Sequence, residues 1–497
     1  MSLLESPHPS TLLHMDWNTV SHLTPQEIRR LQERRLKHFF HHELPYSPYF
    51  RASFEKHNLK FTDINTIEDL QKVPFTSKAD LAPTVEDPAK SRAFILQPDE
   101  HLIKKYAAKG KLIGILLQKI TGQNVKRKLE WEYKPIHLHF TTGRTALPTA
   151  VGYSARDLEV LKETAGRLFD TMGIPHDAVV VNAFPYAPHL AFWLTFFATS
   201  SLQLTTLQTG GGKVMGTQKI IDAIERLKAK VVTAIPGYFY HSLREAVAQK
   251  KNWSNLEYVV FGGERVSEGL RAKVKELLKE VGATKTKIFA TYAMTEGKTA
   301  WVQCSEETGY HTYPDMEIFE VVDENGNRVP EGQPGELVYT SLNWRGTVMV
   351  RYRTGDIIQG LSYGQCPHCG RTVAQISKDI KRKSDIKEFN LTKVKGELVD
   401  LNAFFPLLSG TPEVEEWQLQ IAKVNNDPYE VDELVLYVAP KANITFMQLE
   451  HALNRKIMAE TGVTARLVEK PLAEILTMVG METEPKEKRV VDVRPKG

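Results

Sequence analysis

The sequence predicts an α/β protein: a large N-terminal domain of mixed and parallel sheets with flanking helices, followed by a small α+β domain. Between residues 179 and 292, strand-like and helical segments alternate, which is typical of βαβ units around a mostly parallel sheet. From residue 316 short strands replace the helices, and past residue 384 strands and a helix mix again. The chain has 497 residues, 42% of them hydrophobic, and is longer than a domain with a single hydrophobic core usually is. We therefore expect two domains, over residues 1–383 and 384–497.

The first domain should begin with an amphipathic helix after Thr24, because Thr-Pro-Gln-Glu is a capping box and apolar residues follow at helical spacing. Ser154 can cap a second helix that runs towards Gly173. In the alternating region, strands are expected at residues 179–183, 230–235, 258–261 and 287–292. Helices are expected over residues 217–228 and from Ser267 to about Gly282.

The β-rich part predicts strands at residues 316–322, 336–341 and 348–352, with a turn through Asn325-Gly326. In the small domain, strands are expected at residues 417–424, 433–438 and 465–468. A helix should begin after Thr445, because Gln448 completes a capping box. We find no internal repeat and no low-complexity tract.

Composition narrows the classes of protein. The net charge is only +4, from 64 basic and 60 acidic residues, which disfavours a nucleic-acid partner. The N-terminal residues lack a secretory signal, and the most apolar stretch, residues 191–198, is too short to span a bilayer, so we expect no membrane partner. Three cysteines are too few for a disulfide framework, and we expect a reducing cytoplasm.

Two pentapeptides carry the most functional information: Tyr-Ala-Met-Thr-Glu, which ends at Glu296, and Tyr-Arg-Thr-Gly-Asp, which ends at Asp356. A carboxylate after a glycine turn can accept both hydroxyls of a ribose. An aromatic ring followed by a hydroxyl and a second carboxylate can stack on adenine and hold Mg²⁺, because hard cations prefer oxygen ligands. Taken alone, the Arg-Thr-Gly-Asp string is a weak signal, because Gly-Asp also occurs in ordinary hairpin turns.

Three further segments support a nucleotide site. The loop from His139 to Thr149 combines hydroxyls, a glycine and a basic side chain, which suits phosphate oxygens but also an ordinary polar loop. The strand over residues 258–261 ends in Gly-Gly-Glu, which lets a flat ligand lie on the backbone or simply makes a tight turn. The basic segment around Lys486 is either functional or a solvated tail.

In this order, from about residue 130 to the end, the motifs resemble the adenylate-forming superfamily and most closely its phenylacetate-CoA ligase branch. The resemblance implies an AMP-forming acid:CoA ligase with a mobile small domain, which uses ATP, Mg²⁺ and CoA. It implies that Asp356 binds the ribose, Glu296 with Thr295 the magnesium, and Lys486 the reacting α-phosphate. The remaining nucleotide-binding positions that it implies are Thr141, Thr142, Gly143, Arg144, Thr145, Gly263, Glu264, Tyr292 and Lys383, with Asp385 at the hinge.

The chain departs from the family pattern at three places. The phosphate loop lacks one glycine and the usual lysine, and Arg144 is the candidate replacement. The ribose-contacting arginine is replaced by Lys383 or displaced to Arg382. The catalytic lysine is Lys486 by spacing, with Lys488 as the alternative.

The three cysteines fall at Cys304 and in the knuckle from Cys366 to Cys369. With His311 they make four ligands at spacings typical of structural zinc, and His368 is the alternative fourth ligand. A closed site of this kind, spanning residues 304–369, would clamp the segment that carries Asp356 to the strand end that carries Glu296. Isolated cytosolic thiols are the competing interpretation.

The leading hypothesis is activation of an aromatic or arylacetic acid to an acyl-adenylate and its transfer to CoA. The expected acyl pocket includes Phe184, Tyr186, His189, Tyr238 and Ala293, although the aromatic members suit core packing equally well. The alternatives are transfer to an amine, a protein thiol or an inorganic nucleophile, and a degenerate nucleotide-binding regulator. A zinc-ribbon nucleic-acid binder is disfavoured. A homodimer is one candidate oligomeric state.

Overall fold

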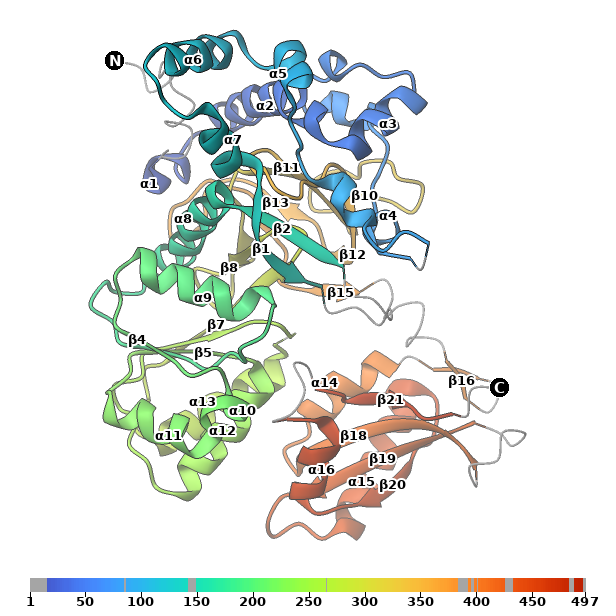
Figure 1. Ribbon diagram of the computed structural model, residues 1–497. Coiled ribbons are helices and arrows are strands. Elements are labelled where there is room, and N and C mark those ends of the chain that lie inside the picture. The colour runs from blue at the N-terminus through green and yellow to red at the C-terminus, as the bar shows by residue number, and fades with distance from the viewer. Residues whose placement is uncertain are drawn as a thin grey trace. The chain divides into compact units, whose positions relative to one another are not determined.

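The computed structural model describes residues 16–84, 86–141, 149–264, 266–382, 392–394, 397–399, 401–424, 432–481 and 487–494. The chain forms two compact units, each made of several stretches of sequence (Figure 1). The first comprises Met1–Asp177, Ala187–Leu204 and Thr291–Ile380, and the second comprises Ala178–Tyr186, Thr205–Ala290 and Lys381–Gly497. The division at residue 383 stays a prediction.

The first unit holds the N-terminal helices. The capping box at Thr24 is confirmed, since its side chain accepts a hydrogen bond from the Glu27 amide. Ser154 likewise caps a helix that ends at Gly173, which adopts a left-handed conformation. The helices are α1 (Trp17–Val20), α2 (Pro25–His42), α3 (Pro48–Lys56), α4 (Lys78–Leu81), α5 (Glu100–Tyr106), α6 (Lys109–Ile120), α7 (Val125–Tyr133), α8 (Ala155–Met172) and α9 (Leu190–Ser201).

The strands of the first unit are mainly antiparallel. Strands β1 and β2 form a hairpin, β10, β11 and β12 form an antiparallel sheet with β15 beside β12, and β8, β9, β14 and β13 pair in that order. Their bounds are β1 (Pro135–Phe140), β2 (Ala150–Ser154), β8 (Thr299–Val302), β9 (Tyr310–His311), β10 (Glu317–Val322), β11 (Gly335–Ser341), β12 (Tyr352–Ile358), β13 (Leu361–Ser362), β14 (Gln375–Ile376) and β15 (Ile380–Arg382), of which only Ile380 belongs to this unit. The short strands predicted at residues 316–322 and 336–341 correspond to β10 and β11.

The second unit contains the predicted βαβ region. Its strands are β3 (Val180–Asn182), β4 (Thr206–Gln208), β5 (Val231–Ala234), β6 (Tyr258–Phe261) and β7 (Lys287–Met294). They are parallel in the order β4-β3-β5-β6-β7, with residues 287–290 of β7 paired to β6. Residues 291–294 of β7 belong to the first unit and pair with β8 in antiparallel fashion. The accompanying helices are α10 (Gly212–Met215), α11 (Thr217–Arg226), α12 (Pro236–Ala248) and α13 (Glu268–Glu280). Ser267 caps α13 as expected.

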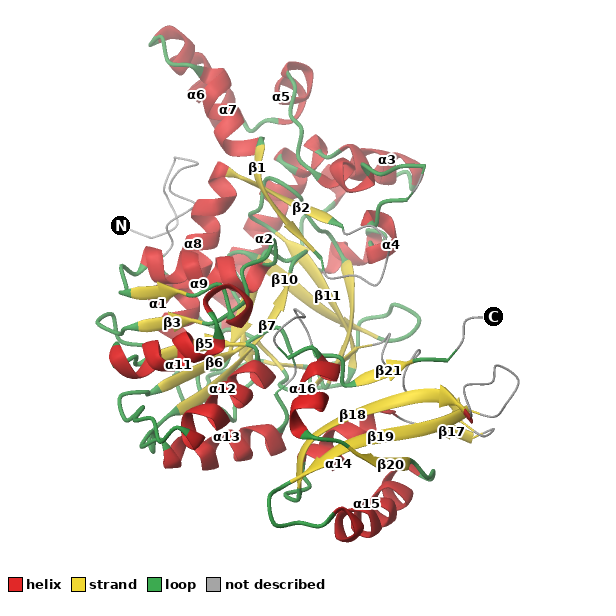
Figure 2. Cartoon of the chain, turned by 60° about the horizontal axis from the view of Figure 1, so that its bottom comes forward, coloured by secondary structure: helices red, strands yellow, loops and turns green. Residues whose placement is uncertain are grey.

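The C-terminal part of the second unit is the expected α+β arrangement (Figure 2). A four-stranded sheet in the order β20-β19-β18-β21 packs against α14, α15 and α16 around a core that includes Leu419, Leu436 and Leu453. The bounds are β16 (Thr392–Val394), β17 (Glu397–Val399), α14 (Phe404–Ser409), β18 (Val414–Lys423), β19 (Asp432–Pro440), α15 (Phe446–Thr461), β20 (Arg466–Glu469), α16 (Leu472–Val479) and β21 (Val490–Asp492).

One predicted strand, at residues 348–352, is wrong. Residues 348–351 lie outside any strand, and β12 begins only at Tyr352 and runs through Asp356 to Ile358. Arg351 has a left-handed φ of 43°, which breaks an extended strand before Tyr352. Its guanidinium forms an ion pair with buried Glu320 at 3.1 Å, and this contact compensates for the strained backbone.

In the part of the chain that the structure describes, every helix is too short or too polar to cross a bilayer.

Candidate active site

The two pentapeptides are interlocked in the first unit. The Tyr292 hydroxyl, on β7, donates a hydrogen bond of 2.7 Å to Oδ2 of Asp356, on β12. In return, the Tyr352 hydroxyl donates one of 3.0 Å to Oε1 of Glu296. The tyrosine of each motif therefore holds the carboxylate of the other, and the two predicted carboxylates belong to one cluster.

A bulge in β12 places Asp356. The pairing of β12 with β11 is irregular between Glu336 and Val338, and Gly355 lies in the bulge with a φ of 75°. Thr354 supports it, since its hydroxyl donates to the Leu337 carbonyl and accepts from the Asp356 amide. Asp356 is thus held in a strand, so the competing interpretation of an ordinary hairpin turn does not apply, and the glycine is needed for its backbone conformation.

Tyr292 packs against a second buried aromatic residue, Trp301. Its ring stacks on Trp301 with a centroid separation of 5.5 Å and an interplanar angle of 29°. The Trp301 indole donates a hydrogen bond of 2.5 Å to Oε1 of Glu317, a buried carboxyl that also accepts from the Tyr313 amide. Burial raises the pKa of Glu317 to about 8 despite these two hydrogen bonds, so the group is largely protonated at neutral pH.

Glu317 gives a pH-dependent prediction. Its pKa is about 8 in the folded state and near 4.5 when unfolded, so the folded state binds more protons between these values. The free energy of unfolding should therefore fall as the pH rises through this window. Glu317→Gln keeps the acceptor for Trp301 without the charge and should flatten the fall. Urea unfolding at about pH 5 and about pH 8 gives the free energy of unfolding at each pH. An equal fall in this free energy for the wild type and Glu317→Gln would contradict the raised pKa.

An ion pair that the sequence did not disclose lies just after Thr295 and Glu296. Lys298, fully buried with a φ of 61°, forms a salt bridge of 2.8 Å with Asp157 in the first turn of α8. The same carboxylate accepts from the Gly346 amide at 2.7 Å. Burial lowers the pKa of Lys298 and the Asp157 carboxylate opposes that shift. A pair separated by 141 positions leaves no local sequence pattern by which to find it.

The predicted phosphate loop is described only at its two ends. Thr141 and Thr149 form a backbone hydrogen bond of 3.0 Å, and both hydroxyls are buried with no hydrogen-bond partner among the described residues. Oriented hydroxyls of this kind fit an oxygen-rich ligand. The predicted residues Thr142, Gly143, Arg144 and Thr145 lie outside the described residues, as do Lys383, Asp385 and Lys486.

The second unit carries the Gly-Gly-Glu segment at the end of β6. Gly263 has a φ of 85°, and a side chain there would find open space, so the glycine is needed for its conformation. One carboxylate oxygen of Glu264 accepts a hydrogen bond of 2.8 Å from the Glu487 amide. Glu264 therefore contacts the C-terminal segment directly after Lys486.

Three of the five predicted acyl-pocket residues also belong to the second unit. Phe184 and Tyr238 are buried, whereas Tyr186 is 61% exposed. A Cβ on Gly212 would lie 2.9 Å from the Tyr238 ring, so the Gly210-Gly211-Gly212 segment packs directly on this tyrosine. The two others belong to the first unit, where the His189 ring hydrogen-bonds the Phe140 carbonyl at 3.0 Å and Ala293 is exposed.

The cysteine cluster forms as predicted in the first unit. The ligand atoms of Cys304, His311, Cys366 and Cys369 all lie within 4.8 Å of one another. The Sγ atoms of Cys304 and Cys366 are 3.6 Å apart, and Nε2 of His311 is 3.3 Å from Sγ of Cys369. A hydrogen bond from Cys304 holds the pKa of the Cys369 thiol well below its usual value. The alternative ligand, His368, instead faces Glu307 at 4.0 Å.

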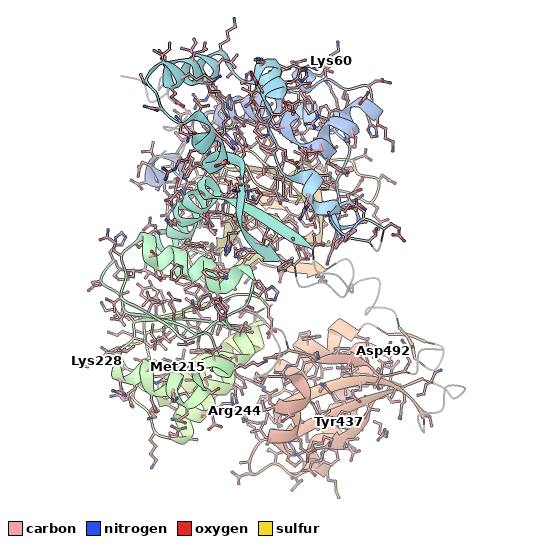
Figure 3. The ribbon with its side chains drawn as sticks, viewed as in Figure 1. Lys60, Met215, Lys228, Arg244, Tyr437 and Asp492 are labelled. Atoms are coloured by element: carbon pink, nitrogen blue, oxygen red, sulfur yellow. The ribbon has the colours of Figure 1, made fainter. Side chains whose placement is uncertain are left out.

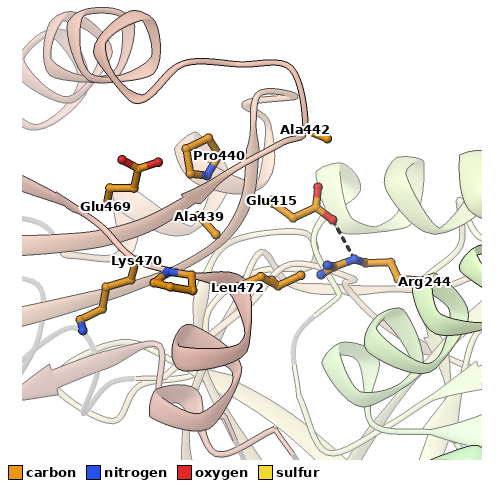
Figure 4. Close-up of a pocket in the computed structure, with 9 residues that line it drawn as sticks. Arg244, Glu415, Ala439, Pro440, Ala442, Glu469, Lys470 and Leu472 are labelled. Atoms are coloured by element: carbon orange, nitrogen blue, oxygen red, sulfur yellow. Dashed lines mark ion pairs between the residues drawn. The ribbon is translucent and has the colours of Figure 1, made fainter.

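A cavity of about 670 Å³ lies elsewhere, in the second unit (Figure 4). Arg244, on α12, lines it and forms an ion pair of 2.7 Å with Glu415 (Figure 3 labels Arg244). Lys470 and Glu469 line its other side. The predicted site residues do not line this cavity, so it does not define the candidate active site.

Fold and site together are those of an adenylate-forming enzyme. Residues 62–349 match the AMP-binding enzyme family, and the chain belongs to this family. The chain is 26% identical to a phenylacetate-coenzyme A ligase of Thermus thermophilus, over 95% of this chain and 98% of the relative. A phenylacetate-coenzyme A ligase of Aromatoleum evansii is 25% identical over 97% and 98% of the two chains. A D-alanine–D-alanyl carrier protein ligase of Bacillus velezensis is 26% identical, over 42% of this chain and 41% of the relative.

A solved structure shares the whole fold. The 2-hydroxyisobutyryl-CoA ligase in its postadenylation state superimposes with a TM-score of 0.74 at 19% identity, covering 99% of this chain and 94% of that one. The resemblance stated from the motifs is thereby confirmed at the level of the superfamily and fold.

Proposed function

We propose that the protein uses ATP to activate an aromatic or arylacetic acid as its acyl-adenylate and then transfers the acyl group to CoA. The observation that carries this proposal is the reciprocal pairing of Tyr292 with Asp356 and of Tyr352 with Glu296. It holds a ribose-binding carboxylate and a magnesium-binding carboxylate in one cluster, as a nucleoside triphosphate requires.

The proposed chemistry has two steps. A carboxylate oxygen of the acid attacks the α-phosphorus of ATP, the bond to the bridging oxygen breaks, and pyrophosphate leaves. The CoA thiolate then attacks the acyl carbon, and AMP leaves with the electron pair of the broken bond. Carboxylates are poor acyl donors and AMP is a good leaving group, so the first step makes the second possible.

Each side chain has a proposed role. Asp356 accepts the ribose hydroxyls and Tyr292 lies against adenine, both in the first unit. For Gly263, in the second unit, the adenine contact implied by the family resemblance stays a prediction. Glu296 with Thr295 supplies oxygen ligands that suit Mg²⁺, which would neutralise phosphate charge when bound. The buried hydroxyls of Thr141 and Thr149, which have no hydrogen-bond partner among the described residues, support the placement of phosphates at this loop. Lys486 would stabilise the charge that develops at the α-phosphate.

An aromatic acid is favoured by two observations. Both full-length relatives named above are phenylacetate-coenzyme A ligases. Phe184 and Tyr238 provide aromatic surface, and Gly212 lets the glycine segment approach the Tyr238 ring. Exchange of labelled pyrophosphate into ATP, measured over a panel of aliphatic, aromatic and arylacetic acids, tests the proposal. Strongest exchange with an arylacetic or aromatic acid is expected, and preference for a short aliphatic acid would overturn the substrate class.

The acyl acceptor has a second candidate, the thiol of a carrier protein. The similarity to a D-alanine–D-alanyl carrier protein ligase supports it, as does the departure of the loop around Arg144 from the CoA ligase pattern. Adding CoA to enzyme that has formed its adenylate distinguishes the two. Rapid thioester formation supports CoA, whereas adenylate that persists in excess CoA supports another acceptor.

We also propose that the cysteine cluster holds a structural zinc ion. Zn–S and Zn–N bonds of about 2.3 and 2.0 Å in a tetrahedron place neighbouring ligand atoms about 3.5–3.8 Å apart. The 3.6 Å between the Sγ atoms of Cys304 and Cys366 lies in this range, and the 3.3 Å between Nε2 of His311 and Sγ of Cys369 is slightly shorter. Four protein ligands leave no open position, so the ion would join β8, β9 and the 366–369 knuckle rather than take part in catalysis.

Purified, unchelated protein should therefore contain close to one equivalent of zinc. Cys369→Ser should lower that content and the unfolding temperature, because metal binding is coupled to folding. His368→Gln is the matched control and should retain both. Less than about half an equivalent in the wild-type protein, by elemental analysis, would contradict the site.

A further inference from the structure

Helix α6 in the first unit presents an apolar stripe to solvent. All 12 of its residues are described and none is buried. Ile113, Leu116, Leu117 and Ile120 recur at helical spacing and are 57%, 59%, 57% and 81% exposed. A contiguous stripe of large aliphatic side chains on a helix is far less common on a water-facing surface than single exposed residues, and it indicates a surface that is covered in use.

The same segment is strongly basic. Residues 101–129 contain no aspartate or glutamate, although the chain as a whole carries a net charge of only +4. The basic residues of this segment are Lys104, Lys105, Lys109, Lys111, Lys119, Lys126, Arg127 and Lys128. Trp131, on α7, is 43% exposed just beyond them. The overall charge balance of 64 basic and 60 acidic residues conceals this block.

The orientation of α6 is fixed by one of these lysines. The Lys111 side chain turns inward, where its Nζ lies 3.2 Å from Glu132 and 3.5 Å from Glu43 and also contacts the Tyr133 hydroxyl. The opposite face, with the apolar stripe, therefore points away from the unit. Both views show α6 at the outer edge of the first unit (Figure 1, Figure 2).

We propose that α6 docks the protein on the surface of an anionic lipid bilayer, with the stripe buried at the boundary between headgroups and acyl chains. An aliphatic face bordered by lysines is the pattern of helices that lie in a membrane interface. Docking in the interface needs no spanning helix, so it is compatible with the absence of one from the described residues. The proposal is independent of the acid that the enzyme activates.

The charge pattern favours lipid over the other occupants. A second copy of the chain would bring two segments with eight basic and no acidic residues face to face, and like charges would oppose that contact. The stripe lies on a convex helix, which a fluid bilayer accommodates without a matching groove. Anionic headgroups surround a docked helix on all sides, so they can neutralise its lysines whichever way the helix lies in the plane of the bilayer.

Flotation of the full-length protein with vesicles tests the proposal. The protein should float with vesicles that contain about 30% phosphatidylglycerol in phosphatidylcholine, and far less with phosphatidylcholine alone. Binding should weaken between about 0.1 M and about 0.5 M salt, because surface charges are screened. The triple variant Ile113→Ser/Leu117→Ser/Ile120→Ser should lose at least about tenfold in bound fraction, as should Lys109→Glu/Lys119→Glu.

Matched controls replace equally exposed side chains elsewhere. Val214→Ser/Met447→Ser removes side chains that are 67% and 80% exposed, and Lys219→Glu/Lys279→Glu reverses two exposed charges. Both should bind as the wild type does, and all variants should retain pyrophosphate exchange. No flotation with anionic vesicles, equal losses in the controls, or a dimer that only the α6 variants convert to monomer would overturn the proposal.

Discussion

Asp356→Ala is expected to lower kcat/KM for ATP in the adenylation step by at least about 100-fold, because two charge-assisted hydrogen bonds to the ribose are lost. Asp356 is 2% exposed, and its carboxylate accepts a hydrogen bond of 2.7 Å from the Tyr292 hydroxyl. Its geometry is fixed by the bulge at Gly355 before ATP arrives. Pyrophosphate exchange at varied ATP concentration measures the loss, and the KM for the acid should change much less.

Tyr292→Phe separates this role from a purely structural one. It removes the hydroxyl and keeps the ring that stacks on Trp301, so a smaller loss is expected. The two residues are in contact, so the double variant with Asp356→Asn should lose less than the sum of the single losses. Equal loss of ATP and acid affinity, together with a large fall in unfolding temperature, would point to a packing role for Asp356.

Lys486→Ala is expected to abolish adenylation while sparing thiolysis of a supplied acyl-adenylate. Removing a preorganised cation at the α-phosphate typically costs about 100- to 1000-fold in rate. The second step does not create charge at that phosphate, so it should continue. Single-turnover assays, one with ATP and acid and the other with synthetic acyl-adenylate and CoA, measure the two steps separately.

Lys488→Ala is the matched control, two residues along the chain. The Lys488 amide donates to the Val479 carbonyl at 2.9 Å, and its own carbonyl accepts from Gln418. Replacing its side chain leaves these backbone contacts in place and should leave both steps near wild-type rates. A larger loss of adenylation rate for Lys488→Ala than for Lys486→Ala would assign the catalytic role to Lys488. An equal loss of the adenylation and thiolysis rates in Lys486→Ala would contradict a role for Lys486 in adenylation alone.

Much of the fold was predictable because its cues are local. The capping boxes at Thr24 and Ser154, the cap at Ser267 and the alternation from residue 179 to 292 each specify an element within a few positions of sequence. The cysteine cluster was predictable because few other arrangements explain a Cys-x2-Cys knuckle together with Cys304 and His311. These features depend little on tertiary context.

The rest depended on contacts between distant positions. The start of β12 is set by Arg351, whose left-handed backbone is compensated by Glu320, 31 positions earlier. The hydroxyl of Tyr292 reaches a carboxylate 64 positions later in the chain, and no periodicity reports such a pairing. Glu317 lies in a strand predicted from sequence, but only its burial beside Trp301 in the structure accounts for its raised pKa.

Carboxylate-dependent exchange of labelled pyrophosphate into ATP by the wild-type protein distinguishes an acid-activating enzyme from a nucleotide-binding regulator. The interlocked carboxylates Asp356 and Glu296 predict exchange that needs both Mg²⁺ and an acid, strongest with an arylacetic or aromatic acid and lost in Asp356→Ala. Absence of exchange with every acid of the panel, in protein that binds ATP, would contradict an acid-activating enzyme and favour a nucleotide-binding regulator.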